Sequence, residues 1–358
     1  MKRTLTLLSA LLLAPLAALH AGDTPLKDAT ARQVAEVAAD IFTRDYQALP
    51  PTSRARWARA VEPDAQGMIG FNRKRWDGAG NQRSGVLALM EAAMEGDQKR
   101  FERCWPLVMV TFDHMQPDGL IEARYEDGRL RERKDCFADS LFWMSHLGWA
   151  LRVVEGSPLA EFAKRKITAL QPLIARHAAF MREAGEYLLL HDAGCPNRLF
   201  IYATACGLVG ERMNDGPLRD LGSRLAQRGL ALQRDDGVFL ERGGFDTGYQ
   251  CVSIQFLQIY LRAFPNEAGE KTLARAVAVE LPRIAPNGEV SAESNTRTGV
   301  NREAYYGRAK GINYQSVFLG LGLYAVVHND DAARAAAERA DAFYWSKRRQ
   351  PPVKAKDQ

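Results

Sequence analysis

Five pairs of helical segments follow one another along the chain, and the first segment of each pair is the more apolar one. The partner segments carry more charge, as at Lys164 to Lys166. A helix that is apolar on every side is buried on every side, whereas an amphipathic helix covers a core from outside. The pattern therefore predicts inner helices alternating with outer helices. The expected pairs are 86–94 with 98–114, 139–154 with 158–184, 199–213 with 217–233, 246–264 with 268–284, and 314–328 with 331–345.

A short turn motif precedes three of the apolar helices. The motif is an Asp or Asn followed by Gly and then apolar residues, at Asp118-Gly119, Asp236-Gly237 and Asn287-Gly288. A repeat of one turn and two helices is typical of α/α toroids. We therefore predict an all-α fold, an α/α toroid in the form of an incomplete or complete six-hairpin barrel. A superhelical solenoid is the alternative, although it needs a tighter repeat length. Strand signals are confined to 187–190 and 237–240.

The first 21 residues have the features of a secretory signal peptide. Lys2 and Arg3 precede an apolar run that reaches Leu19, and this run is short for a membrane span. We expect a periplasmic or secreted protein with one toroid domain at 22–350 and a disordered tail at 351–358. An uncleaved membrane anchor is the alternative. We expect no membrane association after cleavage.

Composition and charge exclude several classes of partner. The 358 residues are 46% apolar and 25% charged, with a formal charge of +5. This mild charge does not predict nucleic-acid binding, although it is compatible with an anionic ligand in a local basic cleft. The five cysteines have neither zinc-site nor redox-pair spacing, and the sequence contains no metal triad or phosphate loop. We expect no cofactor and no metal.

The stretch from 235 to 264 is the strongest candidate for a site. It brings a group of polar residues to the start of an apolar helix, which is how an enzyme site is often built. Asp246 as a helix cap and Tyr249 as a core aromatic are the structural alternatives. The polar residues are Glu241, Arg242, Asp246, Tyr249 and Gln250.

Two further segments share the pattern Asn-x-Arg-Ser/Thr-Gly-Val, at 81–86 and 295–300. The planar guanidinium of arginine matches carboxylates and sulfates. We expect both segments at the mouth of the toroid, where the turns into the inner helices gather. Asn197 precedes another inner helix, with a capping role as the alternative. Candidates for substrate binding are Arg83, Asn81, Glu241, Asp246, Gln250, Asn295, Arg302, Tyr306, Arg308 and His191.

The sequence Asp236-Gly237-Val238-Phe239-Leu240-Glu241-Arg242 is followed by Phe245-Asp246-Thr247-Gly248-Tyr249. These residues resemble the polysaccharide lyases that cleave hyaluronate and chondroitin. That family has an Asp-Gly-Ser-Phe run ending in His, and then a Tyr-x-Gly-x-Tyr segment. The second family tyrosine falls on Tyr249, whereas Arg242, or Glu241 in a shifted register, holds the His position. The resemblance spans about 195–311 and implies an α/α toroid that acts on an anionic polysaccharide or oligosaccharide.

The resemblance implies β-elimination at a uronic acid. In that reaction the substrate carboxylate is neutralised, a base removes the neighbouring proton, and an acid protonates the leaving oxygen. Asn197 would neutralise the carboxylate, helped by Arg297 or Arg242, and Tyr249 would be base, acid or both. His191 could share the role of base.

Two other functions remain open at this stage. Other α/α toroids hydrolyse glycosides with two carboxylates, and Asp139 could pair with Asp246 or with Glu241 for that purpose. The third reading is a non-catalytic periplasmic toroid that binds a glycan. An assay for an unsaturated product separates a lyase from a hydrolase, because only the lyase forms a new double bond.

Overall fold

The computed structural model describes residues 63–64, 67–69, 76–125, 127–299, 302–305 and 308–349. The predicted signal peptide and tail lie outside these residues, and so do Tyr306 and the side chain of Arg308.

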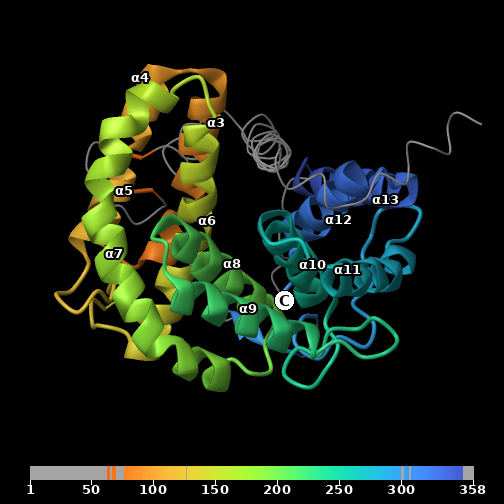
Figure 1. Ribbon diagram of the computed structural model, residues 1–358. Helices are drawn as coiled ribbons and strands as arrows, with labels where there is room; N and C mark the ends of the chain where they lie inside the picture. Colours follow the sequence, from red (N-terminus) through yellow and green to blue (C-terminus); the bar gives the residue numbers. More distant parts are fainter. Residues whose placement is uncertain are drawn as a thin grey trace, which may run out of the picture.

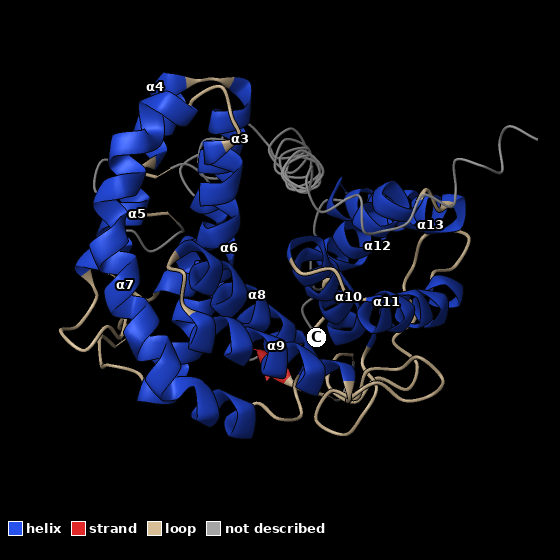
Figure 2. Ribbon diagram, in the orientation of Figure 1, coloured by secondary structure: helices blue, strands red, loops and turns tan. Residues whose placement is uncertain are grey.

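The described residues form helices joined mostly by short turns (Figures 1 and 2). The inner helices are α3 (Arg83–Glu95), α6 (Arg133–Glu155), α8 (Pro196–Arg212), α10 (Thr247–Ala263) and α12 (Tyr314–His328). The outer helices are α4 (Gln98–Cys104), α5 (Pro106–Asp113), α7 (Ala160–His191), α9 (Gly216–Leu230), α11 (Glu267–Glu280) and α13 (Asp331–Arg349). There are two short 3₁₀ helices, η2 (Ala79–Gln82) directly before α3 and η3 (Leu281–Arg283) directly after α11. A small antiparallel pair consists of β1 (Ala304–Tyr305) and β2 (Arg308–Ala309).

The inner helices pack against one another in chain order, from α3 through α6, α8 and α10 to α12. Each also packs against the outer helix that follows it, as α8 does against α9 and α12 against α13. The result is the arc of helical hairpins in Figure 1. This is the predicted architecture of an α/α toroid, and the described residues supply five hairpins of it.

The predicted strand at 187–190 is wrong, because these residues are the last turn of α7. Leu188 is 1% exposed while Leu190 is 80% exposed, so the apolar run has one buried side at helical spacing. The other predicted strand, 237–240, contributes an isolated bridge between Gln233 and Phe239. The first outer segment is split at Pro106 into α4 and α5, because proline cannot donate the backbone hydrogen bond that would continue the helix.

The three Asx-Gly turns share one geometry. The Asp or Asn side chain accepts a hydrogen bond from the backbone N–H two residues on, at 3.0 to 3.1 Å. Each glycine has φ between 87° and 92°, a region that L side chains avoid. A Cβ there would also overlap a backbone carbonyl of the outer helix packed on the turn. The turns dock Asp118-Gly119 on α7, Asp236-Gly237 on α11 and Asn287-Gly288 on α13.

The core lies between the inner and outer helices and contains large aromatic side chains such as Trp143, Tyr202 and Phe200. None of the five cysteines forms a disulfide bond, and all five are buried. In the part of the chain that the structure describes, no helix combines the length and apolar character needed to cross a bilayer.

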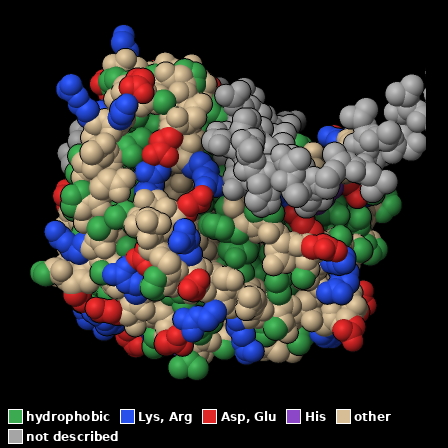
Figure 3. All heavy atoms as spheres, viewed as in Figure 1, with side chains coloured by type: hydrophobic (Ala, Val, Ile, Leu, Met, Phe, Trp, Pro, Cys, Tyr) green, Lys and Arg blue, Asp and Glu red, His purple; other side chains and the backbone are tan. Residues whose placement is uncertain are grey.

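The inner helices also enclose a mostly apolar cavity of about 60 Å³ near their middle turns. On the face in Figure 3, hydrophobic side chains gather near the middle, among charged side chains of both signs. The cavity lining includes Leu87, His146, Trp149, Thr204, Phe256 and Leu319, so every inner helix contributes to it.

Candidate active site

The start of α10 is fixed by the Asp246 carboxylate, which is 1% exposed. It accepts the backbone N–H of Gly248 at 3.1 Å, which caps the helix. It also accepts the backbone N–H of Arg297 at 3.1 Å and of Thr298 at 2.8 Å. One side chain therefore holds the loop around 297 against the helix start.

Two other residues expected to bind substrate are likewise engaged inside the fold. Asn295 is 1% exposed, and its side-chain oxygen accepts the backbone N–H of Thr247 at 2.9 Å. Gln250 is also 1% exposed, accepts the backbone N–H of Phe239 and donates to the carbonyl of Gly237. Asp246, Asn295 and Gln250 therefore hold the backbone that carries Tyr249 and Arg297, and their side chains are buried.

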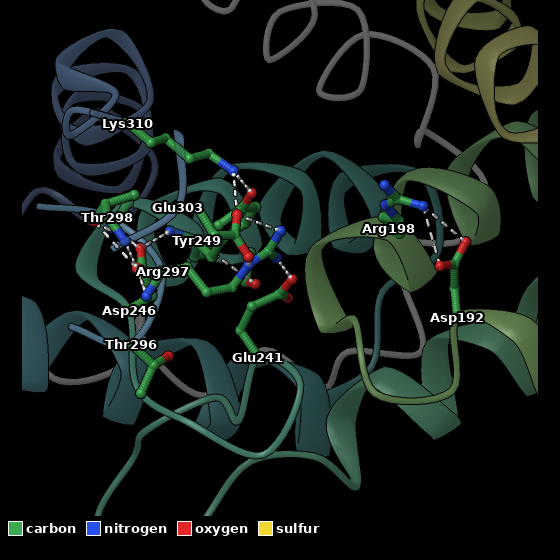
Figure 4. Close-up of polar contacts among 12 residues, drawn as sticks. Asp192, Arg198, Glu241, Asp246, Tyr249, Thr296, Arg297, Thr298, Glu303 and Lys310 are labelled. Carbon is green, nitrogen blue, oxygen red and sulfur yellow. Dashed lines mark hydrogen bonds and ion pairs between the residues drawn. The ribbon is translucent and has the colours of Figure 1, made fainter. Parts of the chain in front are cut away.

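Tyr249 lies in the first turn of α10 beside two cations (Figure 4). The guanidinium of Arg297 lies 4.2 Å from the ring centroid and the ammonium of Lys310 lies 4.6 Å from it. Lys310 also donates a hydrogen bond to the Tyr249 hydroxyl. Arg297 in turn pairs with Glu241 and Glu303. These five side chains, Glu241, Tyr249, Arg297, Glu303 and Lys310, are the Tyr249 cluster.

The two carboxylates of the cluster have opposite electrostatic environments. Burial raises the pKa of Glu241 to about 7, against the opposing charge of Arg297, and the side chain is 2% exposed. The hydrogen bond from Arg297 lowers the pKa of Glu303 to about 2. At neutral pH the cluster therefore holds two cations, one fixed anion and one carboxyl group close to half ionisation.

The turn before α8 lies beside the turn that carries Glu241. The backbone N–H of Arg242 donates to the carbonyl of Gly194 at 2.7 Å, and Arg242 has φ of 52°. Asn197, in the first turn of α8, is 7% exposed, and its side-chain oxygen has no hydrogen-bond partner among the described residues. The structure thus brings the turns of Asn197 and Arg242 together next to the cluster.

A second acidic group lies at the start of the arc. The Asp139 carboxylate on α6 accepts the backbone N–H of Gly80 at 2.8 Å, and burial raises its pKa. Burial also raises the pKa of Asp77, while a hydrogen bond from Asn81 opposes the shift. The negative charge of Asp77 contributes a small part of the raised pKa of Asp139. Asp77 thus lies near Asp139, whereas the two expected partners are engaged elsewhere, Asp246 in capping α10 and Glu241 with Arg297.

Several candidates lie apart from the Tyr249 cluster. Arg83, at the start of α3, lies 6.0 Å from the ring of Phe142. His191 ends α7, where it is exposed and its ring stacks on Tyr187. Arg302 is exposed. Within the described ranges no group of three or more His, Cys, Asp and Glu side chains could hold a metal ion.

Glu303 and Asp77 are not among the candidates predicted from the sequence. Glu303 lies in the polar stretch that follows 295–300, and its signal was the density of charged and phenolic residues there. Asp77 lies four residues before Asn81, outside the repeated six-residue pattern. Lys310 lies two residues after the candidate Arg308, and the structure brings it to the hydroxyl of Tyr249.

Comparison with known proteins shows the fold and no closer relationship. No family model matches the chain, and no curated protein matches it by sequence. Two solved structures of unsaturated glucuronyl hydrolases have similar folds, each with a TM-score of 0.53 over 86% of this chain and 84% of the other. One is a variant named together with the oligosaccharide dGlcA-Glc-Rha-Glc, at 15% identity. The other, at 16% identity, comes from Bacillus sp. GL1 and is described as responsible for the degradation of glycosaminoglycan.

These similarities agree with the α/α toroid that the sequence predicts. They support the toroid part of the resemblance to the hyaluronate and chondroitin lyases, but not the lyase type specifically.

Proposed function

We propose that the protein is an exported enzyme that cleaves a uronic-acid-containing glycan by β-elimination at the Tyr249 cluster. The observation that carries this proposal is the Tyr249 hydroxyl beside the Lys310 ammonium, with the Arg297 guanidinium over the ring. A phenol transfers protons more readily when positive charge stabilises its phenolate form. The names of the similar structures refer to glucuronyl groups and glycosaminoglycan, which supports a uronate as substrate. Export rests on the signal-peptide features of residues 1–21.

The chemistry assigns a step to each group. Tyr249 removes the proton from the sugar carbon next to the carboxylate, and the electron pair forms a double bond as the glycosidic bond breaks. Arg297 and Asn197 neutralise the substrate carboxylate and so stabilise the enolate-like intermediate. The leaving oxygen takes a proton, supplied by Tyr249 if the same phenol acts as acid after acting as base. The products are an unsaturated uronide and a new chain end.

A second candidate function is hydrolysis by Asp77 and Asp139. Both carboxyl groups have a raised pKa, and a carboxyl group that keeps its proton can act as general acid toward a glycosidic oxygen. The similar structures are named as hydrolases, which also fits this reading. Hydrolysis adds water across the bond and forms no double bond.

The test is a panel of uronate polymers incubated with the purified protein and followed by ultraviolet absorbance and by release of reducing ends. We expect both signals to rise together with wild-type protein. Tyr249→Phe should lower the rate of absorbance increase by about 10²- to 10⁴-fold, because it removes the proton-transfer group. Asn197→Ala should lower it as well. Tyr187→Phe is the matched control, since Tyr187 is exposed and belongs to α7.

Full activity of both Tyr249→Phe and Asn197→Ala on every polymer would contradict the proposed lyase site. Release of reducing ends without a rise in ultraviolet absorbance would instead support hydrolysis by Asp77 and Asp139. In that case Asp139→Asn should abolish the release of reducing ends. Binding of a polymer with neither signal would identify a binding protein.

A further inference from the structure

The Glu303 carboxylate lies between the two cations of the Tyr249 cluster. One of its oxygens accepts from Nε of Arg297 at 2.7 Å, and the other accepts from the Arg297 NH2 group at 3.1 Å and from the Lys310 ammonium at 3.2 Å. This two-oxygen contact is the general geometry by which a guanidinium binds any carboxylate. The position therefore suits a carboxylate from another molecule equally well.

Glu303 is the most exposed member of this contact. Its side chain is 40% exposed, against 13% for Arg297 and 27% for Lys310. It precedes β1, and its backbone is bonded to both cationic residues: its N–H donates to the carbonyl of Arg297, and its carbonyl accepts the N–H of Lys310. By contrast Arg297 is also held from below by the buried Glu241. Arg297 is therefore anchored on its buried side, whereas the Glu303 side chain is the part of this contact most open to solvent, so only a side chain has to move for the carboxylate to leave.

We infer that Arg297 and Lys310 form a subsite for the carboxylate of a uronate residue, which the Glu303 side chain occupies until the ligand displaces it. The identity of the ligand rests on the proposed function. The inference adds the position at which the uronate carboxylate binds, and it names Glu303 as the side chain that must move away.

The location also fits the reaction. Lys310 contacts both the Glu303 carboxylate and the Tyr249 hydroxyl. A substrate carboxylate in the place of Glu303 would therefore lie one hydrogen-bonding group away from the phenol. β-Elimination removes the proton on the carbon that bears the carboxylate, so the base and the carboxylate must be neighbours. The exchange also preserves charge, since one anion replaces another.

The test measures the affinity of the full chain for glucuronate by calorimetry, with glucose as the neutral comparison. Glu303→Gln and Glu303→Ala should each bind glucuronate about tenfold more tightly than wild type, because the competing internal carboxylate is gone. Glucose binding should not change. Adding Lys310→Ala or Arg297→Gln to Glu303→Gln should abolish the gain. Glu293→Gln is the matched control, an exposed carboxylate before the same loop.

Wild-type affinity in both Glu303 variants, with unchanged thermal unfolding, would overturn the subsite. Tighter glucuronate binding in a protein that cleaves no polymer would support the subsite and contradict the proposed function. Polymer cleavage by the wild type, together with unchanged glucuronate affinity in the two variants, would support the proposed function and contradict the subsite. The near-isosteric Gln variant retains the shape of the side chain, so a folding defect in the Ala variant leaves the test intact.

Discussion

Glu241 is a buried carboxyl group that contacts the same guanidinium as Glu303. With a pKa of about 7, it changes charge across the physiological range. At a pH below this pKa Glu241 is neutral, and Arg297 has one anionic partner fewer. Above it, the ionised carboxylate competes electrostatically with any anion that approaches Arg297.

We therefore expect the affinity for glucuronate to fall severalfold as the pH rises from about 6 to about 8, because Glu241 ionises over this range. Glu241→Gln removes the titration, and its affinity should stay nearly constant over the same range. Calorimetric titrations of both proteins at several pH values check this. An equal pH dependence in both would show that another group is responsible.

For single residues, the sequence predicted which residue types belong to the site, but it did not predict how deeply each is buried or what it contacts. Tyr249 and Arg297 were chosen from sequence and lie in contact. Asp246, Gln250 and Asn295 were chosen for the same polar character, yet they are buried and bonded to the backbone. Burial depends on which loops pack together, and Lys310 reaches Tyr249 across 61 positions. No local pattern encodes such a contact.

At the scale of the element, the start of α10 depends on one carboxylate. Asp246 caps the helix and binds the backbone of Arg297 and Thr298, so its loss frees the loop as well as the helix end. Asp97 is a simpler cap, which accepts only from Arg100 at the start of α4.

Asp246→Ala should lower the free energy of unfolding by about 3 kcal/mol, since it leaves several buried donors unpaired. Asp97→Ala should cost about 1 kcal/mol, the usual value for a helix cap. Urea unfolding followed by circular dichroism measures both. Similar losses in the two variants would mean that Asp246 acts as an ordinary cap. Asp246→Ala should also abolish polymer cleavage, because Arg297 loses its support.

The helices themselves were predicted well because each has a long apolar repeat. The inner helices were expected from their uniform apolar character, and all five are present near the expected bounds. The failure at 187–190 came from a short apolar run, in which helix and strand cannot be distinguished by composition. The β1–β2 pair was missed, since two-residue strands have no period to detect.

For the whole molecule, stability should depend on the buried Glu280 at the end of α11. The residue is 0% exposed, and burial raises its pKa to about 8, with Arg283 opposing the shift. The folded chain keeps this proton up to about pH 8, whereas the unfolded chain releases it near the ordinary value of 4.5. The folded state binds more protons between these values, so stability falls as the pH rises through this window.

Glu280→Gln should therefore unfold at higher urea concentration than wild type at pH 8 and at nearly the same concentration at pH 4.5. The expected gain at pH 8 is on the order of 4 kcal/mol, at about 1.4 kcal/mol for each unit of pKa shift. Urea midpoints at the two pH values provide the measurement. Glu338→Gln, on α13, serves as the control. An equal change at both pH values would assign the effect to packing.

The bonds from Asp246 to the loop at 297–298 also bear on the order of folding. The two helices of each hairpin pack against each other across a short loop, and these contacts can form early. The Asp246 bonds join positions 51 and 52 residues apart, a span similar to that between neighbouring inner helices, and closing it costs more entropy than closing a single hairpin. The helices can therefore be complete while the Tyr249 cluster is still open. The Tyr249 cluster is then completed only when the last two hairpins come together.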